Sequence, residues 1–216
     1  WLQDKLNTIG LRPINNIVDI TNYVMMAYGQ PLHCFDADMI KGGKIVVKTL
    51  PEGTPFVTLD GEERKLSERD LAICNAEEPM CIAGVLGGKG SGTYDTTRDI
   101  LFESAYFHPT WVRKSARRHG LNTDASFRFE RGIDPDGQLY ALKQAALLAK
   151  ELAGGEIAME IVDVQSPELK KHFEVELEYK YVHELIGKEI PHDLIRTILT
   201  ALDMEIIVEN DAQLTL

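Results

Sequence analysis

Two polar side chains in this sequence occupy positions that indicate a functional role. Glu103 lies in the apolar run ILFESAYF, residues 100–107, where a carboxylate is costly unless it is paired or faces a cavity. We expect it on the floor of a pocket, accepting a hydrogen bond from a ligand; strand alternation toward solvent is the alternative. His33, in GQPLHCFD, follows a helix end and a proline, where the backbone is irregular and side chains are often functional. A structural hydrogen bond is the other interpretation, and the absence of partners at metal-ligand spacing disfavours a zinc site.

A short basic run occupies residues 113–131. It holds six arginines and lysines against two acidic residues, a local excess of four positive charges in a chain of net charge −11. Such a local excess favours contact with an anion, for example a phosphate-bearing ligand, whereas a solvated helix face is the alternative. The small and hydroxyl residues TDAS inside the run disfavour that alternative, because a solvated helix does not need them.

Other polar positions and glycines carry weaker signals. Thr21 and Asn22 fall within a predicted helix, where both types are unfavourable, which indicates either a polar task or a back-bond to the preceding turn. Gly84 either offers an unhindered backbone N–H to a ligand or ends a strand. Its neighbourhood, GVLGGKGSG, lacks the spacing of a phosphate loop. No serine stands in a GxSxG context, and Cys74 and Cys81 have no histidine nearby in sequence, so a covalent nucleophile is not supported.

Composition bounds the class of protein. The chain has 216 residues, 44% of them hydrophobic, which is enough for a buried core and excludes disorder. Its three cysteines form no CxxC pair and indicate thiols in a reducing compartment. No apolar run reaches membrane-spanning length and no signal peptide is visible, so we expect a soluble, cytoplasmic protein without membrane partners. Because the chain starts at Trp1 and stops in QLTL, we expect a piece of something longer.

The periodicity predicts an α+β fold in which mixed helices and strands precede a smaller module. The expected helices cover residues 1–9, 15–28, 108–120 and 136–153, and the expected strands cover residues 44–50, 71–75, 80–88, 100–107 and 157–164, with a hairpin over 56–66. We place the first domain at residues 1–165, a linker at 166–172, and a truncated α+β, winged-helix-like module at 173–216. That module reads strand, helix, helix, strand, strand.

Four motifs carry a family resemblance. In chain order they are VDITNYVMMAYGQPLHCFD, GVLGG, LFESAYF and RRHGLNTDASFRFERG, and together they span most of residues 10–165. This set resembles the editing domain of bacterial phenylalanine–tRNA synthetase beta subunits. The tail, GKEIPHDLIRTILTALDMEIIVEN, is similar to the start of the next module of those subunits, which has a nucleic-acid-binding-like fold.

The resemblance implies hydrolysis of mischarged tyrosyl-tRNA(Phe), serving phenylalanyl-tRNA synthesis by the full enzyme. By this comparison Glu103 accepts a hydrogen bond from the tyrosine phenol, Gly84 donates its N–H to the same oxygen, and His33 holds the ester end or its attacking water. Ala83 stands where relatives carry glycine, so its methyl group is expected to tune the pocket.

The resemblance also places Thr21 and Asn22 near the aminoacyl group and terminal adenosine, and Thr123 and Ala125 in the pocket wall. The candidate phosphate or interdomain contacts are Arg117, Arg118 and Arg128. It implies tRNA(Phe) and an alpha subunit as partners in an alpha2-beta2 assembly. ATP and Mg²⁺ serve the full enzyme, with no cofactor or metal in this fragment. A non-catalytic tRNA-binding or scaffold module with a vestigial pocket is the alternative.

Overall fold

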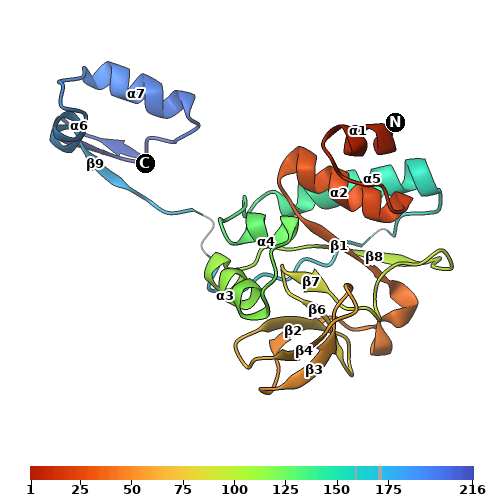
Figure 1. Cartoon of the computed structure of the whole chain (residues 1–216). Coiled ribbons are helices and arrows are strands. Elements are labelled where there is room, and N and C mark those ends of the chain that lie inside the picture. Colours follow the sequence, from red (N-terminus) through yellow and green to blue (C-terminus); the bar gives the residue numbers. More distant parts are fainter. Residues whose placement is uncertain (159, 170–171) are drawn as a thin grey trace. The chain divides into compact units, whose positions relative to one another are not determined.

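The computed structural model describes residues 1–158, 160–169 and 172–216. It divides into two compact units, Trp1–Val162 and Asp163–Leu216, which we describe separately (Figure 1). Both units mix helices with antiparallel strands, which confirms the predicted α+β class.

The first unit combines helices with several small sheets. Its helices are α1 (Leu2–Thr8), α2 (Asn16–Tyr28), α3 (Pro109–His119), α4 (Asp124–Phe129) and α5 (Gln138–Ala153), with short 3₁₀ turns η1 (Ala37–Met39) and η2 (Lys41–Gly43). Its strands are β1 (Leu32–Asp36), β2 (Val46–Thr49), β3 (Thr54–Val57), β4 (Glu63–Leu66), β5 (Leu71–Cys74), β6 (Pro79–Ile82), β7 (Leu86–Gly87) and β8 (Ile100–Ser104). The sheets are the ribbon β1–β8, the four-stranded β2-β5-β6-β7 and the hairpin β3–β4.

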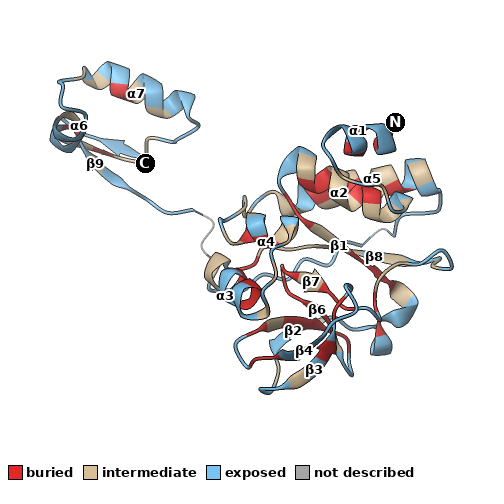
Figure 2. Ribbon diagram, viewed as in Figure 1, coloured by how far each residue is buried: buried red, intermediate tan, exposed pale blue. Residues whose placement is uncertain are grey.

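The ribbon β1–β8 lies between two hydrophobic cores. Leu32 and Phe102 pack with the helical core built from α1, α2 and α5. Phe35, on the opposite face of β1, belongs to the core formed with β3 to β6 and helices α3 and α4. Figure 2 shows the buried faces of α2 and α5 meeting above the ribbon. The apolar side chains of the strand pair are therefore divided between two cores, one on each face.

Helix α2 leads directly into β1, and its ends are fixed by local chemistry. The Asn15 side chain accepts a hydrogen bond from the Val18 N–H, which caps the helix start. Gly29 ends the helix in the left-handed conformation at φ 74°, where other residues are strained. These two residues set where β1 begins, and with it the position of His33.

The structure corrects three sequence expectations. Residues 80–88 form two strands instead of one, because Gly84 turns the chain at φ 69° between β6 and β7. Residues 124–129 form a helix that we did not predict, capped by a reciprocal pair of hydrogen bonds between Thr123 and Ser126. The strand expected at 157–164 is wrong for the described residues there, which have no regular structure; residue 159 lies outside the described residues.

A buried carboxylate fastens α3 to the strand β5. Asp70, fully buried, accepts hydrogen bonds from the Ser67 N–H (2.8 Å) and from His119 Nε2 (2.8 Å), and it forms an ion pair with Arg118. Burial raises the pKa of Asp70, but the hydrogen bonds from Ser67, Ser115 and His119 outweigh it and hold the pKa below its ordinary value. The folded state thus favours the charged carboxylate.

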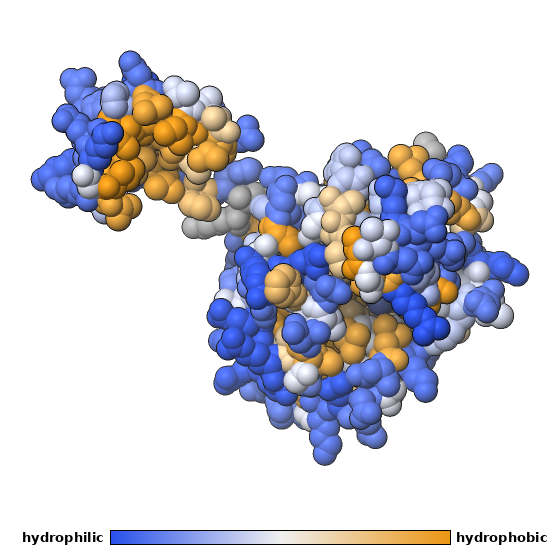
Figure 3. Space-filling model, turned by 45° about the horizontal axis from the view of Figure 1, so that its top comes forward, coloured by the Kyte–Doolittle hydropathy of each residue, from blue (hydrophilic) through white to orange (hydrophobic). Residues whose placement is uncertain are grey.

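The second unit is small. It contains β9 (Glu176–Glu178), α6 (Tyr179–Ile186), α7 (His192–Ala201), β10 (Val208–Glu209) and β11 (Gln213–Thr215), with sheet order β10-β11-β9. This order of elements is the one predicted for residues 173–216. Its buried core consists of Tyr179, Ile195 and Leu214. Apolar side chains gather on its surface (Figure 3). The exposed ones include Leu185 and Ile186 of α6, Leu194 and Ile198 of α7, and Leu202 directly after α7.

Among the described residues, no helix combines the length and the apolar character that crossing a membrane requires.

Asp70→Asn should lower the free energy of unfolding of the first unit by about 2–4 kcal/mol, because it removes the charge that Arg118 and His119 face. Urea unfolding followed by the fluorescence of Trp1 and Trp111 at pH 7 measures this loss. Asp95→Asn, at an exposed aspartate, is the control. Equal midpoints for the two variants would contradict the anchoring role of Asp70.

The contribution of Asp70 to stability should be present above its ordinary pKa of 3.8 and be lost as the pH falls through its pKa in the folded protein.

Candidate functional site

His33 and Glu103 face each other across the ribbon. They are direct partners in the antiparallel register of β1 and β8, so their side chains lie on the same face. That face also carries Phe35, whose ring meets the His33 ring edge-on at 4.5 Å between centroids. The pair therefore points toward the core that contains β6 and away from the helical core. Cys81 of β6 is close enough to Glu103 that the carboxylate raises the pKa of its thiol, an effect second to that of burial.

Burial shifts the pKa values of both groups toward their neutral forms. It lowers the pKa of His33 to about 4 and raises the pKa of Glu103 to about 7. The buried Nε2 of His33 has no hydrogen-bond partner, and Glu103 has no hydrogen bond or ion pair to any described residue. Two unpaired polar side chains on one face are the arrangement expected where a ligand supplies the missing partners.

A glycine of β7 makes room for the His33 ring. A Cβ at Gly87 would lie 2.6 Å from Cε1 and 3.1 Å from Nε2 of His33, which is closer than real contacts allow. Sequence analysis did not single out Gly87. The signal for it was the pair Gly87-Gly88 after an apolar run, which marks a close approach of other groups to the backbone.

Gly84 turns the chain next to this strand. Its positive φ of 69° disfavours other residues, and a Cβ there would meet the side chains of Phe107, Val112 and Phe129 at 3.0–3.1 Å. Its N–H has no hydrogen bond to any described residue. Both sequence interpretations therefore find support, since the same glycine forms the turn and leaves a backbone donor unused.

Thr123 caps the start of α4, and Ala125 lies in its first turn. The Thr123 hydroxyl donates to the Val85 carbonyl (2.9 Å) and accepts from the Ser126 N–H (3.0 Å), so it ties α4 to the turn that contains Gly84. Ala125 packs against the core that includes Phe35. Because its hydroxyl is engaged on both sides, the Thr123 side chain is fixed in position.

Thr21 and Asn22 lie on α2. The Thr21 hydroxyl donates to the Val18 carbonyl at 2.8 Å, which is the back-bond that sequence analysis gave as an alternative. Asn22 is half-buried, and its side-chain amide has no hydrogen bond to any described residue. Of the two, Asn22 is the one with free donors and an acceptor.

Comparison with known proteins identifies the architecture. Residues 1–154 match the B3/4 domain family. The chain belongs to the B3/4 domain family. It is 66% identical over 216 residues to the phenylalanine–tRNA ligase beta subunit of Bacteroides thetaiotaomicron, a match covering 100% of this chain and 26% of that protein. For the beta subunits of Porphyromonas gingivalis and Syntrophus aciditrophicus the identities are 54% over 217 residues and 47% over 210, covering 100% and 97% of this chain and 26% of each relative.

These matches confirm the resemblance that the four motifs indicated, and the chain spans about a quarter of the length of the curated relatives it matches. A solved structure, of an N-terminal fragment of the phenylalanyl-tRNA synthetase beta subunit from Pyrococcus horikoshii, aligns with 92% of this chain and 58% of that one. Its TM-score is 0.43 and its sequence identity is 16%.

The three arginines considered for phosphate contact differ in how the B3/4 domain uses them. Arg118 is paired with Asp70. Arg128 donates to the carbonyl and carboxylate of Asp124 and contacts the Met26 sulfur at 3.0 Å, which links α4 to α2. Arg117 is exposed, and its guanidinium has no partner among the described residues. Of these three arginines, Arg117 is therefore the one whose guanidinium has no partner among the described residues.

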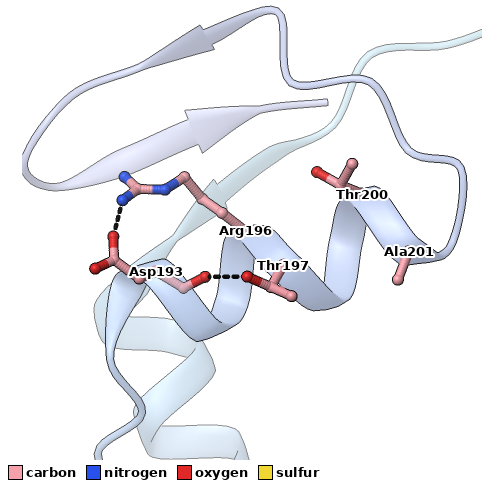
Figure 4. A pocket seen from close by; sticks show the side chains of 5 residues that line it. All are labelled: Asp193, Arg196, Thr197, Thr200 and Ala201. Carbon is pink, nitrogen blue, oxygen red and sulfur yellow. Dashed lines mark hydrogen bonds and ion pairs between the residues drawn. The ribbon is translucent and has the colours of Figure 1, made fainter.

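Outside the B3/4 domain, a shallow hollow on α7 offers no comparable chemistry (Figure 4). It is lined by Asp193, Arg196, Thr197, Thr200 and Ala201. Arg196 is already engaged with Asp193 and with Glu209, and the Thr197 hydroxyl donates to the Asp193 carbonyl. In the part of the chain that the structure describes, no three His, Cys, Asp or Glu side chains group as metal ligands.

Gly87→Ala should displace the His33 ring, because the added methyl group has no room beside it. We expect the imidazole resonances of His33 to shift in NMR spectra and the B3/4 domain to lose about 1–3 kcal/mol of stability. Gly90→Ala is the matched control, since a Cβ there meets nothing within 4 Å. If the His33 resonances of the Gly87 variant coincided with those of the wild type, the placement of the ring would be incorrect.

Proposed function

We propose that this B3/4 domain hydrolyses the ester of tyrosyl-tRNA(Phe), as an editing site within a phenylalanine–tRNA ligase beta subunit. The observation that carries the proposal is the pair His33 and Glu103: both are half-buried, have no hydrogen-bond partner among the described residues, and lie on the same face of one ribbon. The names of the relatives support the enzyme to which the site belongs. The four matched motifs support the editing role.

Editing meets a need that an amino-acid-binding pocket leaves open. A hydrophobic pocket rejects an analogue with one extra hydroxyl only about 10²-fold. A second site that requires the hydroxyl discriminates better, since phenylalanine would leave its polar groups without partners. In this proposal Glu103 accepts the phenol O–H and the free Gly84 N–H donates to the same oxygen.

The chemical step needs no nucleophile from the protein. A water molecule attacks the ester carbonyl, the bond from the carbonyl carbon to the ribose oxygen breaks, and that oxygen takes up a proton. With a pKa of about 4 the His33 ring is neutral at pH 7, so one ring nitrogen can accept a hydrogen bond from a ligand and the other can donate one. We assign His33 to holding the water or the ester end. Orientation and electrostatics then supply most of the rate, with assistance from the adjacent ribose hydroxyl.

The remaining residues complete the substrate site. Thr123 and Ala125 form the wall that admits the tyrosine ring. Thr21 and Asn22 lie toward the aminoacyl group and the terminal adenosine, and Arg117 is the free candidate for a phosphate contact. The proposed partners are tRNA(Phe) and the alpha subunit, and aminoacylation with ATP and Mg²⁺ is assigned to the alpha subunit of the full enzyme.

Glu103→Gln in the complete enzyme should reduce the preference for tyrosyl over phenylalanyl ester by at least about tenfold, because an amide accepts the phenol hydrogen bond less strongly than a carboxylate. Deacylation of the two aminoacyl-tRNAs measures this ratio, and tRNA affinity should change by less than about twofold. Glu63→Gln, at an exposed glutamate of β4, is the control.

Equal loss of tyrosine preference and tRNA affinity would argue against the assigned role of Glu103. A wild-type enzyme that leaves tyrosyl-tRNA(Phe) intact would instead favour the non-catalytic tRNA-binding module.

The preference for tyrosine should rise with pH. Because burial raises the pKa of Glu103 to about 7, the side chain is mostly protonated at pH 6 and mostly a carboxylate at pH 8. Only the carboxylate accepts hydrogen bonds with both oxygens, so the tyrosine-to-phenylalanine ratio of kcat/KM should increase between these values. The ratio in Glu103→Gln should stay flat, and a parallel rise in that variant would sink the explanation.

A further inference from the structure

Leu59 shares the surroundings of His33 without belonging to β1 or β8. It lies in the turn between β3 and β4 and is apolar, yet 48% exposed. A Cβ at Gly87 would lie 2.9 Å from Cδ1 of Leu59 and 2.6 Å from Cε1 of His33. The two side chains therefore converge on the same glycine, one from the hairpin and one from the ribbon.

The turn that carries Leu59 is docked on β7. The Leu59 N–H donates to the Gly87 carbonyl at 2.9 Å, and the Lys89 N–H donates to the Val57 carbonyl at 3.0 Å. Thr58 forms an antiparallel bridge with Gly88 between these bonds. Leu59 is thus held in place by its backbone.

Side-chain hydrogen bonds stiffen the turn further. The Thr58 hydroxyl donates to Asp60 Oδ1 (2.6 Å), and Arg64 donates to Asp60 Oδ2 (2.7 Å) and to the His119 carbonyl at the end of α3 (2.8 Å). The hydrogen bond from Thr58, followed by that from Arg64, lowers the pKa of Asp60 to about 2. The turn keeps its hydrogen bonds at any physiological pH.

Leu59 also explains how the Nε2 atom of the His33 ring is kept from water near the protein surface. The titratable groups facing this side of the ribbon are Glu103 from β8 and Cys81 from β6, and neither gives His33 a hydrogen bond. The unpaired Nε2 of His33 is buried, so an apolar group must keep water from it, and the exposed Leu59 lies against the same side of Gly87 as the His33 ring.

We propose that Leu59 is a positioning residue: it shields the His33 ring from solvent and forms the apolar wall against which the ester end of the aminoacyl-RNA is held. The substrate half of this inference rests on the proposed function. The shielding half concerns this chain alone. A polar residue at this position would admit water competing with the one that attacks the ester.

The first test titrates His33 by NMR in the chain without RNA. In Leu59→Ala we expect the pKa of His33 to rise from about 4 to about 5 or higher, because water can then solvate the charged ring. Leu59→Met should restore the wild-type value. Val57→Ala, at an apolar residue of the same hairpin that is 43% exposed, should leave it unchanged. An unchanged His33 pKa in Leu59→Ala would overturn the shielding role.

The second test uses the complete enzyme with tyrosyl-tRNA(Phe). Leu59→Ala should lower kcat about tenfold or more while KM stays within about twofold, since orientation is lost and binding elsewhere is kept. A raised His33 pKa with unchanged kcat would overturn the positioning role. Failure of the wild type to hydrolyse the ester would overturn the proposed function and the substrate half of this inference, whereas the titration would still decide the shielding.

Discussion

The pairing of β1 with β8 is the constraint on which the rest of the first unit depends. One face of this ribbon completes the helical core through Leu32 and Phe102, and the other completes the sheet core through Phe35. Because side chains alternate between faces, the register that buries these apolar residues also sets His33 opposite Glu103. A slip of one residue would reverse both faces and remove the site together with the cores.

The burial that stabilises the cores disfavours the charged forms of the two site residues. Withdrawing His33 and Glu103 from water disfavours the charge of each, which is why their pKa values move in opposite directions. A protein selected only for stability would carry apolar residues at both positions. Neighbouring elements accommodate these side chains. Gly87 leaves room for the His33 ring, and the hydrogen bond from Thr123 links α4 to the turn containing Gly84. Such local conflict between polarity and burial is typical of functional sites.

The parts of the fold that depend on local interactions could be predicted from the sequence. The helix predicted over residues 15–28 is α2, which Asn15 caps and Gly29 ends, and the hairpin predicted over 56–66 contains the paired strands β3 and β4. Glu103 could be singled out because a carboxylate in an apolar run is anomalous whatever its partner.

The parts missed depend on non-local contacts or on ambiguous patterns. The small and hydroxyl residues TDAS disfavour a solvated helix face, but the helix that they begin was not predicted; Thr123 and Ser126 form its capping box. The apolar pattern of 157–164 resembles a strand, but among the described residues of that stretch none finds a partner strand. Leu59 could not be found from sequence, since its importance comes from the position of His33 in a distant strand. The Gly87-Gly88 pair marks a close approach to the backbone but does not show that His33 makes it.

The separation of His33 and Glu103 along the chain also bears on how the protein is made. The two strands that carry them are joined by residues 37–99, which include the β2-β5-β6-β7 sheet and the β3–β4 hairpin. Loop-closure entropy makes such distant pairings form late, after local helices and hairpins. A nascent chain still attached to the ribosome can complete α1, α2, the β2-β5-β6-β7 sheet and the β3–β4 hairpin before β8 emerges. His33 and Glu103 therefore come to face each other only when β8 closes onto β1.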